Sequence, residues 1–109
     1  QFWAIHPGGP AIVDQLATLF ELTPDQVAAS RTILRQYGNL SSATILFVLN
    51  ELRRSLPPIS SRSKPQSGVA MAFGPGLVIE MARLSYVPTP PTATQVVNQT
   101  QPDAILEPA

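Results

Sequence analysis

The pattern of apolar and polar positions divides the first twenty residues into a strand and a helix. Residues 2–6 begin with the apolar run Phe-Trp-Ala-Ile and are followed by Pro-Gly-Gly, which is typical of a strand that ends in a tight loop. Proline suits the first position of a helix, and from Pro10 onward apolar residues recur at helical spacing. The sequence therefore predicts a strand over residues 2–6 and a helix over residues 10–20.

A second helix has signals at both ends. Thr23 and Gln26 stand at the two positions of a capping box, with proline between them at the first helical position. Gly38 can adopt the left-handed conformation that ends a helix, so the helix should stop at Tyr37. This places Asn39 in the turn directly after the helix.

A third helix is predicted over residues 41–54, because this apolar run is too long for one strand and ends in Glu-Leu-Arg-Arg. Its first two turns are apolar on every side, so we expect neighbours to bury it all round. Without the loop and tail described next, only about 75 residues remain to cover it, a size at which cores are marginal. The pattern is therefore typical of a piece of a larger protein.

The remaining sequence predicts a hairpin and two irregular segments. Residues 56–67 are rich in proline and serine and predict a surface loop. Residues 68–73 and 77–84 predict two buried neighbouring strands joined through a Gly-Pro-Gly turn. Proline, threonine, glutamine and alanine dominate the C-terminal end, which favours a flexible tail. We therefore expect one α/β domain in residues 1–86 and a tail in residues 87–109.

Composition excludes several classes of function. The 109 residues carry seven basic and seven acidic side chains, so the chain lacks the positive field that nucleic-acid binding requires. No apolar run approaches the roughly 20 residues that cross a bilayer, and no secretory signal is visible, so we expect a soluble cytoplasmic protein. The chain has no cysteine, which excludes disulfides and thiolate metal sites, and we predict no metal centre.

Two residues could carry acyl-transfer chemistry. His6 is the only histidine and ends the first predicted strand, where its imidazole could pair with a nucleophile and donate a hydrogen bond to a developing oxyanion. Asn39 could supply a second donor beside it. Each also has a simpler interpretation, because a lone histidine is often structural and asparagine is common in helix-ending turns.

Three short motifs favour the chemical interpretation when they are taken together. Residues 3–10 are Trp-Ala-Ile-His-Pro-Gly-Gly-Pro, residues 37–42 are Tyr-Gly-Asn-Leu-Ser-Ser, and residues 72–76 are Ala-Phe-Gly-Pro-Gly. In this order and spacing they resemble the C-terminal half of type III polyketide synthases, the chalcone synthase-like family, over about residues 2–84. The resemblance implies an α/β fold, the C-terminal half of a thiolase-like fold, with a strand, three helices and a β-hairpin, incomplete without the N-terminal half.

The resemblance also implies roles for individual residues. His6 and Asn39 match the catalytic histidine and asparagine, which in such enzymes hold the thioester oxygen of malonyl-CoA as carbon dioxide leaves. Other matched positions lie near the coenzyme A arm or shape the cavity in which the polyketide folds: Gly8, Gly9, Ser41, Phe73, Gly74, Pro75 and Gly76. Leu40 replaces the commoner methionine and Ala72 the commoner glycine, and both replacements are apolar and small.

The family's nucleophile is missing from this chain. It is a cysteine in the N-terminal half that takes the starter acyl group from coenzyme A, and the chain contains none. The resemblance therefore implies a catalytic half that is inactive alone and needs a cysteine-bearing N-terminal half. It also implies acyl-CoA and malonyl-CoA as substrates, no other cofactor, and a homodimer when complete. Alkylresorcinol, alkylpyrone and naphthol-type products are equally compatible with the sequence.

Two alternatives stay open at the level of sequence. One is a ketoacyl synthase III-like enzyme of the same superfamily, although the Gly-Gly-Pro after His6 and the Phe-Gly-Pro-Gly motif argue against it. The other is a non-catalytic partner subunit or truncated relic of the thiolase superfamily. A relic should tolerate the loss of His6 or Asn39, whereas the assembled enzyme should lose decarboxylation or condensation without unfolding.

Overall fold

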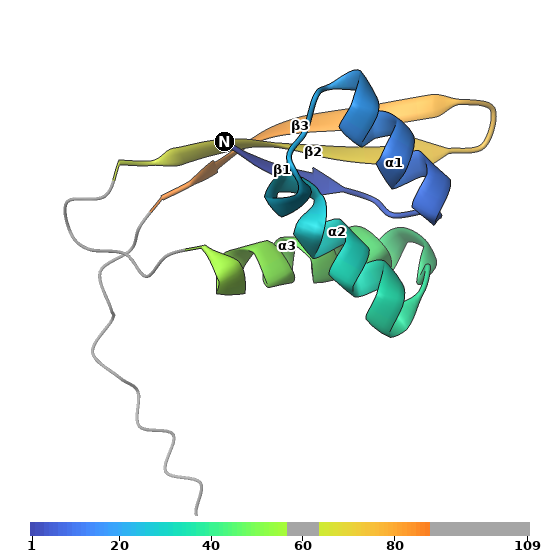
Figure 1. The fold of residues 1–109 in the computed structure, drawn as a ribbon, viewed down its shortest axis with the longest axis horizontal. Coiled ribbons are helices and arrows are strands. Elements are labelled where there is room, and N and C mark those ends of the chain that lie inside the picture. Colours follow the sequence, from blue (N-terminus) through green and yellow to red (C-terminus); the bar gives the residue numbers. More distant parts are fainter. Residues whose placement is uncertain (57–63, 88–109) are drawn as a thin grey trace, which may run out of the picture.

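The chain forms a three-stranded sheet with helices on both sides of its first strand. A computed structural model describes residues 1–56 and 64–87, and Figure 1 shows their arrangement. The elements follow in the order β1 (Phe2–Ile5), α1 (Pro10–Leu19), α2 (Pro24–Tyr37), the 3-10 turn η1 (Ser41–Ala43), α3 (Thr44–Ser55), β2 (Gln66–Gly74) and β3 (Val78–Tyr86). β1 pairs in parallel with β2, and β2 pairs antiparallel with β3, so the fold is mixed α/β, as the sequence predicts.

The elements predicted from sequence are present, and their ends shift by a few residues. The capping box of α2 is formed, because the Gln26 N–H donates to the Thr23 hydroxyl and the Thr23 N–H donates to the Gln26 side chain. Gly38 follows α2 with a φ of +69°, as its position predicts. β2 begins at Gln66, inside the segment predicted as a loop. The rest of that loop, residues 57–63, and the predicted tail from residue 88 lie outside the described residues.

β1 is packed on both faces. Successive side chains of a strand point to opposite sides of the sheet, so β1 contributes to two apolar clusters. Ala4 packs with Ile33 of α2 and Val48 of α3, whereas Ile5 packs with Val13 of α1 and Met71 of β2. Figure 1 shows α1 on one side of the sheet and α3 on the other. The short first strand is therefore the centre of the core.

A serine of α2 closes the free edge of β1. The Ser30 hydroxyl donates to the Ile5 carbonyl at 2.7 Å and accepts from the Ile5 N–H at 3.3 Å. These two groups face away from β2, and no strand among residues 1–56 and 64–87 pairs with them. An unpaired buried backbone group is costly. Ser30 is itself fully buried. Its single hydroxyl therefore makes the two hydrogen bonds that a neighbouring strand would otherwise make with Ile5.

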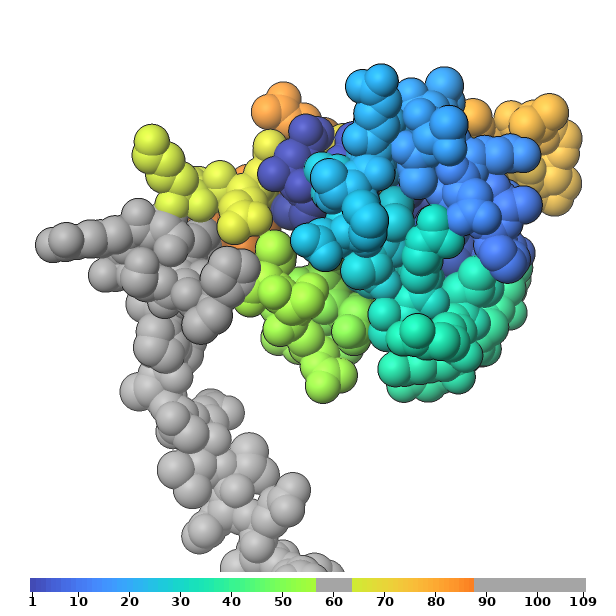
Figure 2. Space-filling view, viewed as in Figure 1, coloured from blue at the N-terminus to red at the C-terminus, as the bar shows by residue number. Residues whose placement is uncertain are grey.

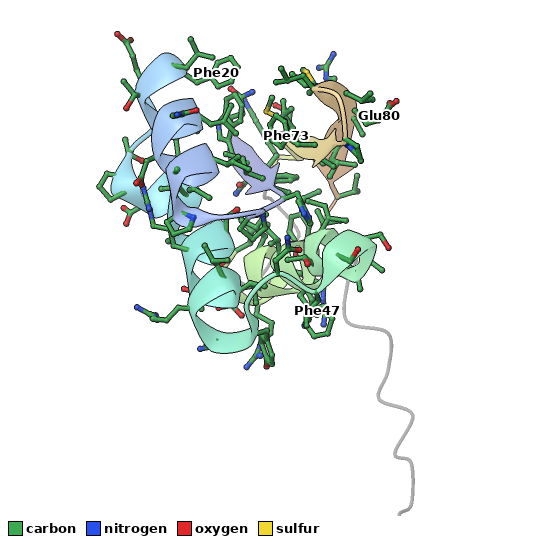
Figure 3. The ribbon with its side chains drawn as sticks, turned by 90° about the vertical axis from the view of Figure 1, so that its right-hand side faces the viewer. Phe20, Phe47, Phe73 and Glu80 are labelled. Carbon is green, nitrogen blue, oxygen red and sulfur yellow. The ribbon has the colours of Figure 1, made fainter. Side chains whose placement is uncertain are left out.

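Two burial predictions are wrong for this chain. α3 is covered on one face only: Val48 is buried, whereas Leu46 is 64% exposed, and Figure 3 shows Phe47 pointing away from the sheet. The hairpin is not a buried pair of strands either, because β3 is exposed along most of its length. In Figure 2 the turn that joins β2 and β3 extends beyond the helices. On the outer side of α3 the Phe47 ring packs against Tyr37 of α2, with ring centroids 5.3 Å apart, and both rings stay partly exposed.

We predict that Ser30→Ala destabilises the protein by about 1–3 kcal/mol, because it leaves both backbone groups of Ile5 buried without a partner. The measurement is the free energy of unfolding in urea. Ser55→Ala is the matched control: its hydroxyl bonds to helix carbonyls at an exposed position, so its loss should change stability by less than about 0.5 kcal/mol. Equal effects of the two substitutions would contradict the role given to Ser30.

Candidate functional site

A surface cavity of about 490 Å³ lies where β1 ends. Three parts of the chain that are far apart in sequence meet there: the residue after β1, the segment between α2 and α3 with the first turn of α3, and the end of β2. The lining residues are His6, Asn39, Ser41, Ser42, Ile45, Ala72 and Phe73. The structure therefore brings His6 and Asn39 to one cavity.

His6 is held in place by its backbone. Its N–H donates to the Met71 carbonyl at 2.8 Å, which continues the pairing of β1 with β2 by one residue, and its carbonyl accepts from the Gly8 N–H at 3.0 Å. The residue is only 9% exposed. Because both backbone groups are engaged, the position of the imidazole follows from the position of the strand.

Burial also changes the acid–base properties of the imidazole. It lowers the pKa of His6 below the ordinary value of 6.5, since desolvation disfavours the charged form. A neutral imidazole carries one N–H donor and one nitrogen acceptor. In this chain His6 is therefore suited to donate one hydrogen bond and to accept another at neutral pH.

The orientation of the Asn39 amide is fixed by its own turn. The Ser41 N–H points at Oδ1 of Asn39 at 2.9 Å. A backbone N–H can only donate, so the amide atom that faces it must be the oxygen. The NH₂ group is then the part of the amide left for a ligand. Asn39 is exposed, so this donor is accessible.

The lining of the cavity combines uncharged polar groups with small or apolar side chains. It contains one imidazole, one amide and two serine hydroxyls among small or apolar side chains, and it has no carboxylate, lysine or arginine. Among the described residues, no group of three or more His, Cys, Asp or Glu side chains could hold a metal ion. Preorganised donors in such a setting stabilise an oxyanion better than they bind a permanent ion.

Not all of the residues singled out in the sequence meet at this cavity. Ser41 and Phe73 line it together with His6 and Asn39. The turn at residues 74–76 is exposed at the tip of the hairpin, and it does not line the cavity in the described structure. Gly8 and Gly9 lie in the loop after His6, where a Cβ on Gly8 would come within 3.0 Å of the Ile12 side chain.

The sequence analysis did not select two of the lining residues. Ser42 and Ile45 lie on the cavity beside Ser41. Residues three apart share one face of a helix, and this spacing is the signal that could have added both to the site. Ala72 was noticed only as a replacement, and it lines the cavity because it is next to Phe73 at the end of β2.

Within residues 1–56 and 64–87, every helix is too short or too polar to cross a bilayer.

The sequence is similar to proteins of known activity. It matches the family model for chalcone and stilbene synthases, C-terminal domain, over residues 1–88. It is 46% identical over 80 residues to bisdemethoxycurcumin synthase of Oryza sativa subsp. japonica, an alignment that covers 72% of this chain and 20% of that protein. The chain thus spans a small part of the length of this curated relative.

We predict that His6 titrates with a midpoint below 6.5 in the 109-residue chain, where it is the only histidine. Below pH 6.5 the unfolded chain then binds more protons than the folded one, so stability is complete above this pH and falls as the pH decreases toward the folded pKa. NMR titration of the imidazole resonance and unfolding curves at several pH values measure both effects. His6→Gln should remove this part of the pH dependence, and a midpoint at or above 6.5 would contradict the prediction.

Proposed function

Since this chain belongs to the chalcone and stilbene synthase family, of which it carries the C-terminal domain, we propose that it is the catalytic C-terminal part of a type III polyketide synthase. The proposed reaction extends an acyl-CoA starter by decarboxylative Claisen condensation with malonyl-CoA. The observation that carries this proposal is that His6 and Asn39 line one cavity, with the amide of Asn39 turned so that its NH₂ group is available. Two donors that converge on one space are what a thioester oxyanion needs.

In the proposed mechanism, a cysteine thiolate from outside this chain attacks the starter thioester and releases coenzyme A. The thioester oxygen of malonyl-CoA then accepts hydrogen bonds from His6 and Asn39. As the malonyl carboxylate leaves as carbon dioxide, its bonding electrons form an enolate, and the negative charge develops on that oxygen. The enolate carbon attacks the enzyme-bound acyl group, the cysteine sulfur leaves, and the chain is longer by two carbons. Ser41 and Phe73 would then contact the growing product.

The acid–base state of His6 depends on this cysteine. Burial alone favours the neutral imidazole, whereas a thiolate close to the ring favours the imidazolium. The two effects oppose each other, so the ion pair exists only while the thiolate is present. When the thiolate is consumed as a thioester, His6 returns to the neutral form, which still has an N–H to donate to the malonyl oxygen.

The exposed apolar surface supports the proposal of a missing half. Leu46 on α3 and Met81 on β3 are each 64% exposed, and Ile79 is 49% exposed. Exposed apolar side chains of this size are typical of an interface. We assign it to the cysteine-bearing N-terminal half, and we expect the assembled protein to be a cytoplasmic homodimer that uses coenzyme A thioesters without another cofactor.

His6→Gln and Asn39→Ala should each lower the rate of malonyl-CoA decarboxylation by about 100- to 1000-fold in the assembled protein, because each removes one donor to the oxyanion. The release of carbon dioxide from radiolabelled malonyl-CoA measures this step without a starter. Asn50→Ala is the control, since Asn50 is exposed on α3, does not line the cavity and accepts a hydrogen bond from Arg53. Activity retained in both site variants would support a non-catalytic relic instead.

The native polypeptide that contains this chain should have a mass well above 11.7 kDa and should carry the missing cysteine. Intact-mass spectrometry measures its size, and iodoacetamide labelling identifies the reactive thiol. Prior incubation with an acyl-CoA starter should protect that thiol, because it then holds the acyl group. A native protein without a protectable cysteine would contradict the proposed nucleophile and leave a partner subunit as the explanation.

A further inference from the structure

A buried threonine lies behind the candidate site, and no step of the proposed mechanism uses it. Thr44 is the first residue of α3 and is fully buried, although the turn before it is exposed. It does not line the cavity. Its hydroxyl nevertheless lies within hydrogen-bonding distance of three atoms, and each of them belongs to a residue between Asn39 and Ser41.

The donors and acceptors in these contacts show how the Thr44 hydroxyl uses its one hydrogen and its two lone pairs. The Thr44 hydroxyl oxygen accepts from the Leu40 N–H at 2.7 Å. Its single hydrogen faces two acceptors, the Ser41 carbonyl at 2.9 Å and Oδ1 of Asn39 at 3.4 Å. The short bonds therefore hold the backbone on both sides of the Asn39–Ser41 turn, and the longer contact reaches the amide itself.

This turn is in a conformation that needs to be held. Ser41 has a φ of +62°, in the left-handed region that residues other than glycine rarely adopt. In the same turn, the backbone of Leu40, with a φ of −93° and a ψ of 24°, directs the Ser41 N–H toward Oδ1 of Asn39, at 2.9 Å. Such backbone strain persists only when the surrounding structure imposes it. The Ser41 carbonyl accepts from both the N–H and the hydroxyl of Thr44, and the hydroxyl bond of 2.9 Å is the side-chain contact that supports the turn.

We propose that Thr44 is a positioning residue for Asn39: its buried hydroxyl holds Leu40 and Ser41 so that the amide oxygen of Asn39 is engaged and its NH₂ group is presented to the substrate oxygen. This inference rests on the proposed role of Asn39 in decarboxylation. Thr44 touches neither the substrate nor the reacting atoms. Without its hydroxyl, the turn loses the contacts to Leu40, Ser41 and Asn39, and the amide is held only by the Ser41 N–H. The amide can then rotate more easily and present its oxygen, which repels an enolate instead of stabilising it.

A double-mutant cycle in the full-length protein tests this inference. Thr44→Val keeps the shape of the side chain and removes the hydroxyl, so it should lower kcat for malonyl-CoA decarboxylation by about 10- to 100-fold and leave KM nearly unchanged. In the Asn39→Ala background, the same substitution should change kcat by less than about two-fold, because the donor that Thr44 positions is already absent. Thr44→Ser keeps the hydroxyl and should restore most of the activity.

Controls separate positioning from folding. Thr18→Val removes a threonine hydroxyl that bonds to a helix carbonyl on α1, away from the cavity, and should leave kcat unchanged. If Thr44→Val does not fold, as judged from its melting temperature, Thr44→Ala replaces it in the cycle. Equal loss of kcat in both backgrounds, or a serine variant as poor as the valine variant, would overturn the inference and leave the proposed function standing. Full activity of Asn39→Ala itself would overturn both.

Discussion

The candidate site depends on the complete enclosure of one short strand. β1 has only four residues, and each direction around its buried end, Ala4 and Ile5, is occupied. α1 packs on one face and α3 on the other, α2 contributes to both faces, β2 pairs with one edge, and Ser30 closes the opposite edge at Ile5. A strand held in this way has no alternative register, because a shift by one residue would exchange its two faces. His6 follows directly, and its backbone, from which the imidazole extends, is held by the same pairing with β2.

Local chemistry made the helices predictable, whereas contacts between distant segments were not. The capping box at Thr23 and the left-handed Gly38 act within a few residues, so the sequence alone indicated both ends of α2. Two contacts join segments that are far apart in the chain: the parallel pairing of β1 with β2 and the bond from Ser30 to Ile5. No local sequence pattern predicts either of them. The apolar circumference of α3 predicted that neighbours bury it all round, whereas the described residues cover it on one side only.

The candidate site was predictable in its residue types and not in its geometry. The motifs indicated His6 and Asn39, and the structure places both on one cavity, together with Ser41 and Phe73. The third motif was only partly informative, since its Gly-Pro-Gly turn lies at the exposed tip of the hairpin. The direction of the Asn39 amide follows from the bond that the Ser41 N–H donates to its oxygen. The left-handed backbone of Ser41 in the same turn has no sequence signal, because residues other than glycine rarely adopt it.

The outer strand has a consequence for handling this chain by itself. β3 is bonded along one edge to β2, and its apolar side chains are open to solvent. Its other edge presents backbone donors and acceptors that can template pairing with a strand of another molecule. Without a cover, self-association through this edge becomes more favourable with every increase in protein concentration. Aggregation, and not loss of the core around β1, is then the process that limits how concentrated a solution of the separate chain can be.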